Sequence, residues 1–337
     1  MRILVIGGSG MIGRQLVPNL LAAGDDVVVL SRGNRAVDVP GAEHVLADRG
    51  DRAAVRSAVA GPFDAVIDNV AYTPADADAI LDALDGRIGH YVLTSTAFVH
   101  PGVRQAGEGP SRPLREADAP SGSLPENDDD MSPHGLYVSG KRRLERHVQA
   151  VCAARSTPLT IVRPSLQLIG PYTDDGRFAW FWLRMRDGGP IWLPLSARVH
   201  AGPCQVGFSG DVARLLAAAA QRPPKTVQVY HAAQPELWSY EEYLGLMAEI
   251  LHRDPDIRYA PRQALDGSPF ASQGVYRLPL PYRVAIDVSG AATDLQFTWT
   301  PMREWMARTG EWANRYYASR DDAYLRLRPQ EIAWQGP

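Results

Sequence analysis

The chain opens with an unbroken run of apolar residues. Residues 2–6 carry four apolar side chains without polar alternation, which is typical of a parallel strand buried on both faces. Apolar residues then recur at helical spacing over 14–23, and Gly24 ends that pattern. Residues 26–30 predict a second strand. The first thirty residues therefore predict a strand, a glycine-rich turn, a helix and another strand.

Strands and helices keep alternating beyond this unit. The pattern predicts strands over 42–46, 63–71 and 90–95, separated by helices over 51–60 and 74–84. Regular alternation of this kind is typical of a parallel sheet with helices on both faces. We therefore expect an α/β protein with a Rossmann-type doubly wound parallel sheet.

The rest of the chain predicts a smaller second lobe. We place a dinucleotide-binding domain at 1–165 and a substrate-binding lobe at 166–337, partly interleaved with the sheet. The connection 101–133 is rich in proline and acidic residues, too polar for a buried element, and is either a lid or a disordered insertion. Residues 254–290 predict irregular structure, and a last helix is expected from about Pro301 to the tail.

Composition narrows the class of protein. With 337 residues, 45% hydrophobic and 22% charged, the chain is typical of a soluble globular protein. It shows no membrane-spanning run and no secretory leader, so we expect a cytoplasmic protein. A net charge of −3 gives no reason to expect nucleic acid. Cys152, Cys204 and the scattered histidines lack metal-ligand spacing. The expected partner is a small-molecule substrate, and a homodimer is left open.

Three glycines follow the first strand. Gly7 allows a sharp turn, Gly10 lets the backbone approach a pyrophosphate, and Gly13 lets the helix pack closely on the sheet. The N-terminus of the following helix favours negative charge. We therefore expect Gly7, Gly10, Met11, Ile12 and Gly13 to bind a dinucleotide; the alternative is a plain glycine-rich turn.

The ends of the next strands predict further cofactor contacts. The second strand ends at Arg32 with no acidic residue, and Arg32, helped by Arg35, would pair with a 2′-phosphate. This favours NADP(H) over NAD(H); the alternative is that both arginines are solvated. Asp48 either accepts a hydrogen bond from adenine or caps the following helix. Val70 and Ala71 end the fourth strand, where open parallel sheets bind ligands.

A hydroxyl group and a tyrosine–lysine pair are the candidate chemistry. Thr96, with Ser95 beside it, ends the fifth strand, where a hydroxyl bonds either a substrate oxygen or its own backbone. Tyr137 and Lys141 lie four residues apart in a predicted helix and share one face. The ammonium and a positive nicotinamide would lower the tyrosine pKa from about 10. In this order, after a glycine loop, the three residues indicate a catalytic site.

These motifs together resemble the extended short-chain dehydrogenase/reductases, also called the NAD-dependent epimerase/dehydratase family. The matching segments are 7–13, Asp48, 93–96, Tyr137-x-x-x-Lys141, 161–164, Gly170-Pro171, 208–213 and 295–301, which cover nearly the whole chain. The resemblance implies an NAD(P)-dependent oxidoreductase. It makes Thr96 the catalytic hydroxyl residue, Tyr137 the general acid/base and Lys141 the ribose-binding lysine.

Some positions depart from the family pattern. His100 stands where the family often has a tyrosine. Ala97 and Phe98 follow the threonine where the dehydratase branch tends to carry Asp-Glu, which argues against a sugar 4,6-dehydratase. The resemblance leaves three functions open. They are a ketoreductase, which the NADP-type loop favours, an epimerase that retains NAD, and a non-enzymatic relative that binds cofactor or RNA.

The second lobe offers two candidate substrate features. The aromatic helix at 178–186 either lines an apolar pocket or packs in the core between the lobes. Arg163, Arg177, Arg184 and Arg186 could hold the diphosphate of a nucleotide sugar. Neither feature identifies the substrate.

Overall fold

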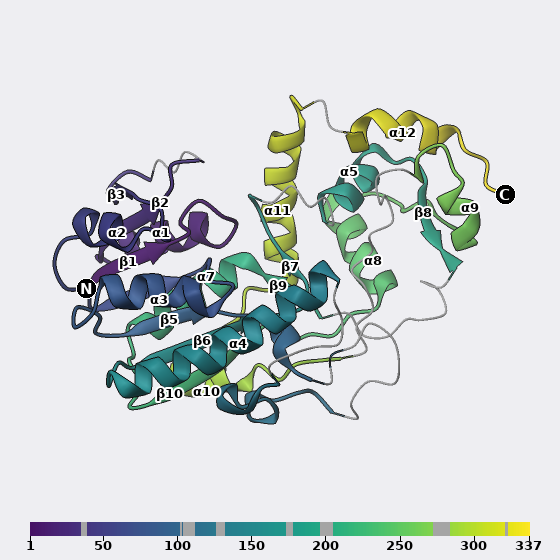
Figure 1. Ribbon diagram of the computed structural model, residues 1–337. Helices are drawn as coiled ribbons and strands as arrows, with labels where there is room; N and C mark the ends of the chain where they lie inside the picture. Colours follow the sequence, from purple (N-terminus) through teal and green to yellow (C-terminus); the bar gives the residue numbers. More distant parts are fainter. Residues whose placement is uncertain are drawn as a thin grey trace.

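Two lobes lie side by side in the computed structural model (Figure 1). The structure describes residues 1–34, 39–101, 103, 112–125, 132–172, 178–195, 205–271, 284–320 and 323–337. The N-terminus belongs to the first lobe and the C-terminus to the second. The predicted Arg35, Arg177 and Cys204 fall outside the described residues, as does much of the connection 101–133.

The first lobe is built on a seven-stranded sheet in which every pairing is parallel. The strand order is β10-β6-β5-β4-β1-β2-β3. The strands are β1 (Arg2–Ile6), β2 (Asp26–Ser31), β3 (Glu43–Leu46), β4 (Ala65–Asp68), β5 (Tyr91–Thr94), β6 (Leu159–Pro164) and β10 (Val227–Ala232). The order reverses direction between β1 and β4, which opens a ligand crevice at their carboxyl ends. The expected Rossmann-type sheet is confirmed.

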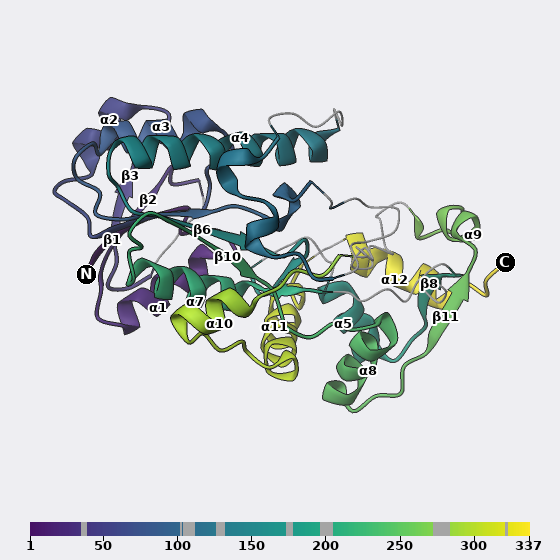
Figure 2. The ribbon, with the colours of Figure 1, turned by 90° about the horizontal axis from the view of Figure 1, so that it is seen from below.

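Helices cover both faces of this sheet (Figure 2). One layer contains α2 (Arg52–Ala58), α3 (Pro74–Ala83) and α4 (Pro133–Ala154), and the other contains α1 (Gly13–Ala22), α7 (Ser209–Ala220) and α10 (Ser289–Leu295). Neighbouring strand residues alternate between the layers, so Leu4 packs beneath α3 while Val5 packs against α1. Because both faces are buried, β1 needs the continuous apolar run that its sequence shows.

The second lobe packs mainly around aromatic side chains. Its helices and strands are α5 (Ala179–Asp187), β8 (Ile191–Pro194), α8 (Tyr240–Leu251), β11 (Ile257–Ala260), α9 (Arg262–Asp266), α11 (Met302–Tyr317) and α12 (Ala323–Ala333). Trp180, Phe181 and Trp182 of α5 are buried in one apolar cluster with Trp305 of α11. This aromatic helix therefore packs in the core, but within the second lobe rather than between the lobes, and Trp180 also lines a cavity beside Tyr317.

Short elements connect the lobes. Strands β7 (Leu168–Ile169) and β9 (Gly207–Phe208) pair with each other at the junction. Three 3-10 turns, η1 (Ala97–Val99), η2 (Glu116–Asp118) and η3 (Ser121–Ser123), follow β5. They carry the chain from the end of β5 toward the start of α4.

Three expectations from the sequence were wrong in detail. The segment 254–290 is not uniformly irregular, because β11 pairs with β8 and α9 follows it. The last helix is interrupted, with α11 ending at Tyr317 and α12 starting at Ala323. The connection 101–133 is not wholly exposed, because Ser121 and Leu124 are buried. In each case long-range packing decides what local composition could not.

The described residues contain no helix that is both long and apolar enough to cross a membrane. The same residues hold no cluster of three or more histidine, cysteine or acidic side chains arranged for a metal ion.

Candidate active site

The glycine loop joins β1 to α1 at the crevice. Gly7 has a φ of +87°, and a Cβ there would lie 2.6 Å from Cγ1 of Val70. A Cβ at Gly13 would lie 2.3 Å from the carbonyl oxygen of Gly7, so this helix start must be glycine. A Cβ at Gly10 would meet no described atom closer than 4.0 Å. The fold itself therefore requires glycine at 7 and 13, whereas Gly10 faces open space.

The N-terminus of α1, where Ile12 is the N-cap residue, has no side-chain cap and no acidic residue beside it. Beside the loop, Oδ1 of Asn69 accepts from Oγ1 of Thr94 at 2.6 Å. This fixes the amide, whose buried Nδ2 has no hydrogen-bond partner among the described residues. Free N–H groups around a concave glycine loop fit an anionic dinucleotide.

The predicted adenosine contacts lie at the ends of β2 and β3. Arg32 follows β2 and is exposed. Asp48 accepts a hydrogen bond from the backbone N–H of Gly50 at 2.8 Å and shapes a turn. It does not cap α2, because Asp51 is the N-cap residue and accepts from Ala54 N at 2.9 Å. The helix-capping alternative for Asp48 was therefore wrong.

Thr96 and Tyr137 face each other across the end of the sheet. The Thr96 hydroxyl lies close enough to the Tyr137 phenol to influence its pKa, and it accepts from Phe98 N at 3.3 Å, at the start of η1. Ser95 is buried and turned toward the carboxylate of Glu145. Neighbouring residues at a strand end point in opposite directions. Of the two hydroxyl candidates, Thr96 is the one beside the tyrosine.

Lys141 lies one turn after Tyr137 in α4 and is almost fully buried. Its Nζ donates to the carbonyl oxygens of Ala71 at 2.8 Å and Thr94 at 2.9 Å, and lies 4.8 Å from the ring centre of Tyr72. An ammonium has three donors, so one remains for a ligand. Burial lowers the Lys141 pKa to about 8.

The part of the Tyr137 pKa lowering that was expected from Lys141 is not found. Burial raises this pKa above its usual value, the nearby Thr96 hydroxyl opposes the rise, and nearby Tyr72 adds to it. The ammonium of Lys141 is directed at two carbonyl groups rather than at the phenol. Desolvation of the phenolate therefore exceeds any attraction to the lysine.

The sequence did not predict several side chains that surround Tyr137 and Lys141. The Tyr72 and His134 rings lie 6.1 Å and 6.4 Å from the Tyr137 ring between centroids, and Phe98 packs edge-on against His134. Tyr72 directly follows the predicted strand-end residue Ala71, so its position was a usable signal. Asp68, a charged residue in an otherwise apolar strand, was another.

Comparison with known proteins now identifies the family. A sequence model described as the NAD dependent epimerase/dehydratase family matches residues 3–233. The chain belongs to this family. The matched region extends from β1 to just past the end of β10, and so includes the glycine loop, Thr96, Tyr137 and Lys141.

Two solved structures of the same fold are UDP-glucose 4-epimerases. The UDP-glucose 4-epimerase of Thermotoga maritima, solved with UDP-glucose, aligns with a TM-score of 0.70 over 94% of this chain and 99% of its own, at 18% identity. The Thermus thermophilus UDP-glucose 4-epimerase, solved with NAD, aligns with a TM-score of 0.67 over 93% and 99%, at 21% identity. At such identities the likeness shows the fold.

A curated relative is a reductase. The 2′-dehydrokanamycin reductase of Streptomyces kanamyceticus is 34% identical to this chain over 167 residues. The match spans 48% of this chain and 42% of that relative, which is less than half the length of each protein. Both a reductase and epimerases thus resemble this chain.

Of the four arginines predicted to hold a diphosphate, the three that the structure describes do not form such a site. Arg163 is fully buried and pairs with Glu145 at 2.6 Å. Arg184 is buried against Glu331, also at 2.6 Å, and Arg186 donates to Oδ1 of Asn314. A buried arginine that is paired with a carboxylate has no charge to spare for a phosphate.

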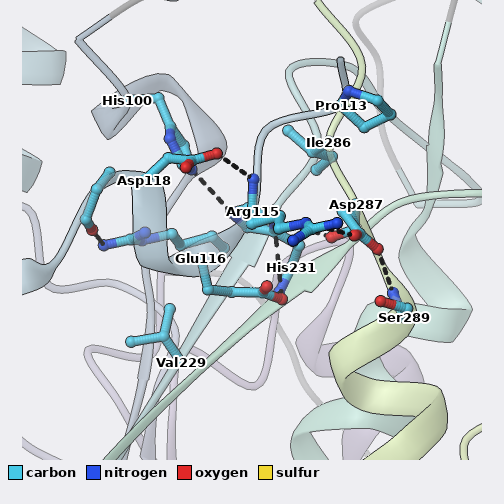
Figure 3. Close-up of polar contacts among 12 residues, drawn as sticks. His100, Pro113, Arg115, Glu116, Asp118, Val229, His231, Ile286, Asp287 and Ser289 are labelled. Carbon is cyan, nitrogen blue, oxygen red and sulfur yellow. Dashed lines mark hydrogen bonds and ion pairs between the residues drawn. The ribbon is translucent and has the colours of Figure 1, made fainter.

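His100, at the position where this family often has a tyrosine, packs against His231. It is buried, and its Nε2 contacts Nε2 of His231 at the end of β10 (Figure 3). Glu116 of η2 accepts from the backbone N–H of His231 at 2.9 Å. Figure 3 also shows Arg115 between Asp118 and Asp287. His100 thus anchors the end of η1 to the sheet.

Proposed function

We propose that the protein is an NAD(P)-dependent oxidoreductase that transfers hydride to or from a keto or hydroxyl carbon of a small molecule, with reduction favoured. The observation that carries this proposal is that the Thr96 hydroxyl lies beside the Tyr137 phenol and influences its pKa, with Lys141 one helical turn away. All three lie at the carboxyl edge of the sheet, on the same side as the glycine loop.

Each residue of the triad has a distinct role in this proposal. The nicotinamide cofactor, when bound, supplies or accepts the hydride. Tyr137 gives a proton to the substrate oxygen during reduction, or takes it during oxidation. Thr96 orients that oxygen by a hydrogen bond. Lys141 donates its remaining N–H to the ribose and holds positive charge beside the developing tyrosinate.

The glycine loop and its surroundings would hold the dinucleotide. Gly7, Gly10, Met11, Ile12 and Gly13 bring backbone N–H groups to the pyrophosphate. Asp48 would contact adenine, and Val70 and Ala71 would line the cofactor cleft. Exposed Arg32, with no acid beside it at the end of β2, supports NADP(H) over NAD(H).

A nucleotide-sugar epimerase is the second candidate. Structural neighbours that carry UDP-glucose and NAD favour it. An epimerase keeps its cofactor through the cycle, whereas a reductase exchanges it. The two candidates therefore differ in whether purified protein retains NAD. A non-enzymatic relative would bind cofactor or RNA without turnover.

A fluorescence titration with NADPH and NADH, after assay for cofactor already bound, tests the proposal. Empty protein that binds NADPH more tightly supports the reductase, and retained NAD supports the epimerase. Tyr137→Phe should keep cofactor affinity and lose most turnover, on the order of a hundredfold or more. Tyr316→Phe, in the second lobe, is a matched control. Unchanged turnover in Tyr137→Phe, or no binding of either dinucleotide, would refute the proposal.

A further inference from the structure

The carboxylate of Asp68 is the most heavily bonded acid in the described part of the first lobe. It is fully buried at the end of β4 and accepts five hydrogen bonds. Arg49 donates two of them, at 3.1 Å and 2.7 Å, and the Tyr91 hydroxyl donates one at 2.8 Å. The backbone N–H groups of Val70 and Ala71 donate the others, each at 3.0 Å.

These bonds fix the turn that carries the lysine acceptor. Asp68 holds Ala71 by its N–H, and Lys141 donates to the carbonyl oxygen of the same residue at 2.8 Å. The turn also touches the glycine loop, because a Cβ at Gly7 would collide with Val70. One buried carboxylate therefore links the glycine loop to the ammonium of Lys141.

We propose that Asp68 is a positioning residue for Lys141 and that it acts through Ala71. Arg49, which is paired with Asp68, offsets the negative charge of this carboxylate. The inference rests on the proposed function, because it takes Lys141 as the residue that donates to the cofactor ribose. Asp68 itself does not need to touch the cofactor.

The charges around Lys141 support this role. Burial is the main influence on its pKa and lowers it to about 8. The carboxylates of Asp68, Glu145 and Asp76 oppose that fall, with Asp68 the largest of the three, while Arg49 adds to it. The Nζ atom of Lys141 also lies over the ring of Tyr72, 4.8 Å from the ring centre. A lysine near its pKa in this range responds to each neighbouring charge.

Substitutions of Asp68 and of Arg49 should have opposite effects on the pH at which Lys141 loses its proton. Asp68→Asn removes the negative charge, so Lys141 should lose its proton at lower pH. Arg49→Gln removes a positive charge, so Lys141 should keep its proton to higher pH. A variant that merely damaged the fold would weaken binding without this change of sign.

Dinucleotide affinity measured against pH tests the proposal. NADPH and NADH are titrated by fluorescence between pH 6.5 and about 10. Wild type should lose affinity on the alkaline side as Lys141 deprotonates. In Asp68→Asn this loss should begin at a pH lower by on the order of one unit. Above the transition, the variant should therefore bind about tenfold more weakly than wild type at the same pH. In Arg49→Gln it should begin later, and Lys141→Met should bind weakly with no alkaline transition.

A matched control is Asp25→Asn, which removes a buried carboxylate that instead pairs with the N-terminal ammonium and Gln221. Its alkaline transition should match wild type. If Asp68→Asn does not fold, Arg49→Gln still decides. Wild type that binds neither dinucleotide overturns the proposed function itself. Wild type that binds but shows no alkaline transition, or an Arg49→Gln variant whose transition moves earlier or not at all, overturns the role of Asp68 alone.

Discussion

The Nε2 atoms of His100 and His231 lie 2.8 Å apart, so one ring donates and the other accepts. Nδ1 of His231 lies 3.0 Å from the carbonyl oxygen of Asp287, which can only accept. Nδ1 of His231 therefore carries the hydrogen, and its Nε2 accepts from His100. Protonation of His231 would place two N–H groups face to face and break the bond.

Mild acid should therefore destabilise the protein. Burial lowers the pKa of His231 to about 4 and that of His100 to about 3, with Arg163 adding to both effects. An unfolded histidine has a pKa of about 6.5, so the unfolded state binds more protons below that value. The contribution of each histidine to the free energy of unfolding is fully present above a pH of about 6.5. It falls as the pH drops toward 4, and at pH 5 each histidine has lost about 2 kcal/mol. Urea unfolding at pH 7.5 and pH 5 measures the difference.

A His231→Gln variant isolates this contribution. Between pH 7.5 and pH 5, the free energy of unfolding of this variant should fall by about 2 kcal/mol less than that of wild type, because one titrating group is gone. Exposed His252 offers a control, since His252→Asn keeps the left-handed backbone (φ 52°) that asparagine tolerates. Equal pH dependence in wild type and His231→Gln would contradict the prediction.

The buried pair of Glu145 and Arg163 predicts a large stability effect. Both side chains are fully buried, and Glu145 also accepts from Ser121 at 2.8 Å. Glu145→Gln leaves the guanidinium buried without its counter-charge, which should cost about 3–5 kcal/mol of unfolding free energy. In contrast, Arg262→Gln breaks an exposed pair with Asp266 and should cost less than about 1 kcal/mol. Chemical denaturation at pH 7.5 compares the two; similar losses would be evidence against the prediction.

Local spacing was enough to predict the parts of the site that lie within one element. The glycines at 7, 10 and 13 and the pair Tyr137 and Lys141 each follow from short-range geometry. The choice between Thr96 and Ser95 could not be made in this way. A shift of one residue reverses the direction of a strand side chain, so only the folded contact with Tyr137 separates them.

Partners distant in sequence were beyond the reach of pattern analysis. Asp68 at the end of β4 meets Arg49, which follows β3, although β1 and β2 lie between these two strands in the sheet. The buried acid was visible in the sequence, but its partner was not. The burial that raises the Tyr137 pKa was missed for a related reason, because it depends on tertiary packing rather than on local spacing.

The glycine loop predicts that two alanine substitutions have opposite consequences. Gly13→Ala forces a Cβ to within 2.3 Å of the Gly7 carbonyl oxygen, so backbone must move and stability should fall by about 2 kcal/mol or more. The Cβ of Gly10→Ala meets no described atom closer than 4.0 Å. The free energy of unfolding of this variant should therefore lie within about 1 kcal/mol of the wild-type value. Its methyl group would nevertheless occupy the space where the backbone approaches the pyrophosphate, so cofactor affinity should fall about tenfold or more. Thermal unfolding and NADPH titration of both variants separate these effects; a Gly10→Ala variant with wild-type affinity would contradict the assignment.

Arg32 should decide which dinucleotide is preferred. Charge-assisted hydrogen bonds to a 2′-phosphate contribute about 1.5–3 kcal/mol, so Arg32→Asp should weaken NADPH binding by about tenfold to a hundredfold. The new carboxylate can accept from a ribose 2′-hydroxyl, so NADH affinity should hold or rise. Arg253→Asp, an exposed substitution in the second lobe with the same change in net charge, should leave both affinities unchanged. The ratio of the two dissociation constants is the measurement, and a ratio that stays the same in Arg32→Asp would mean that Arg32 is a solvated loop residue and that the preference arises elsewhere.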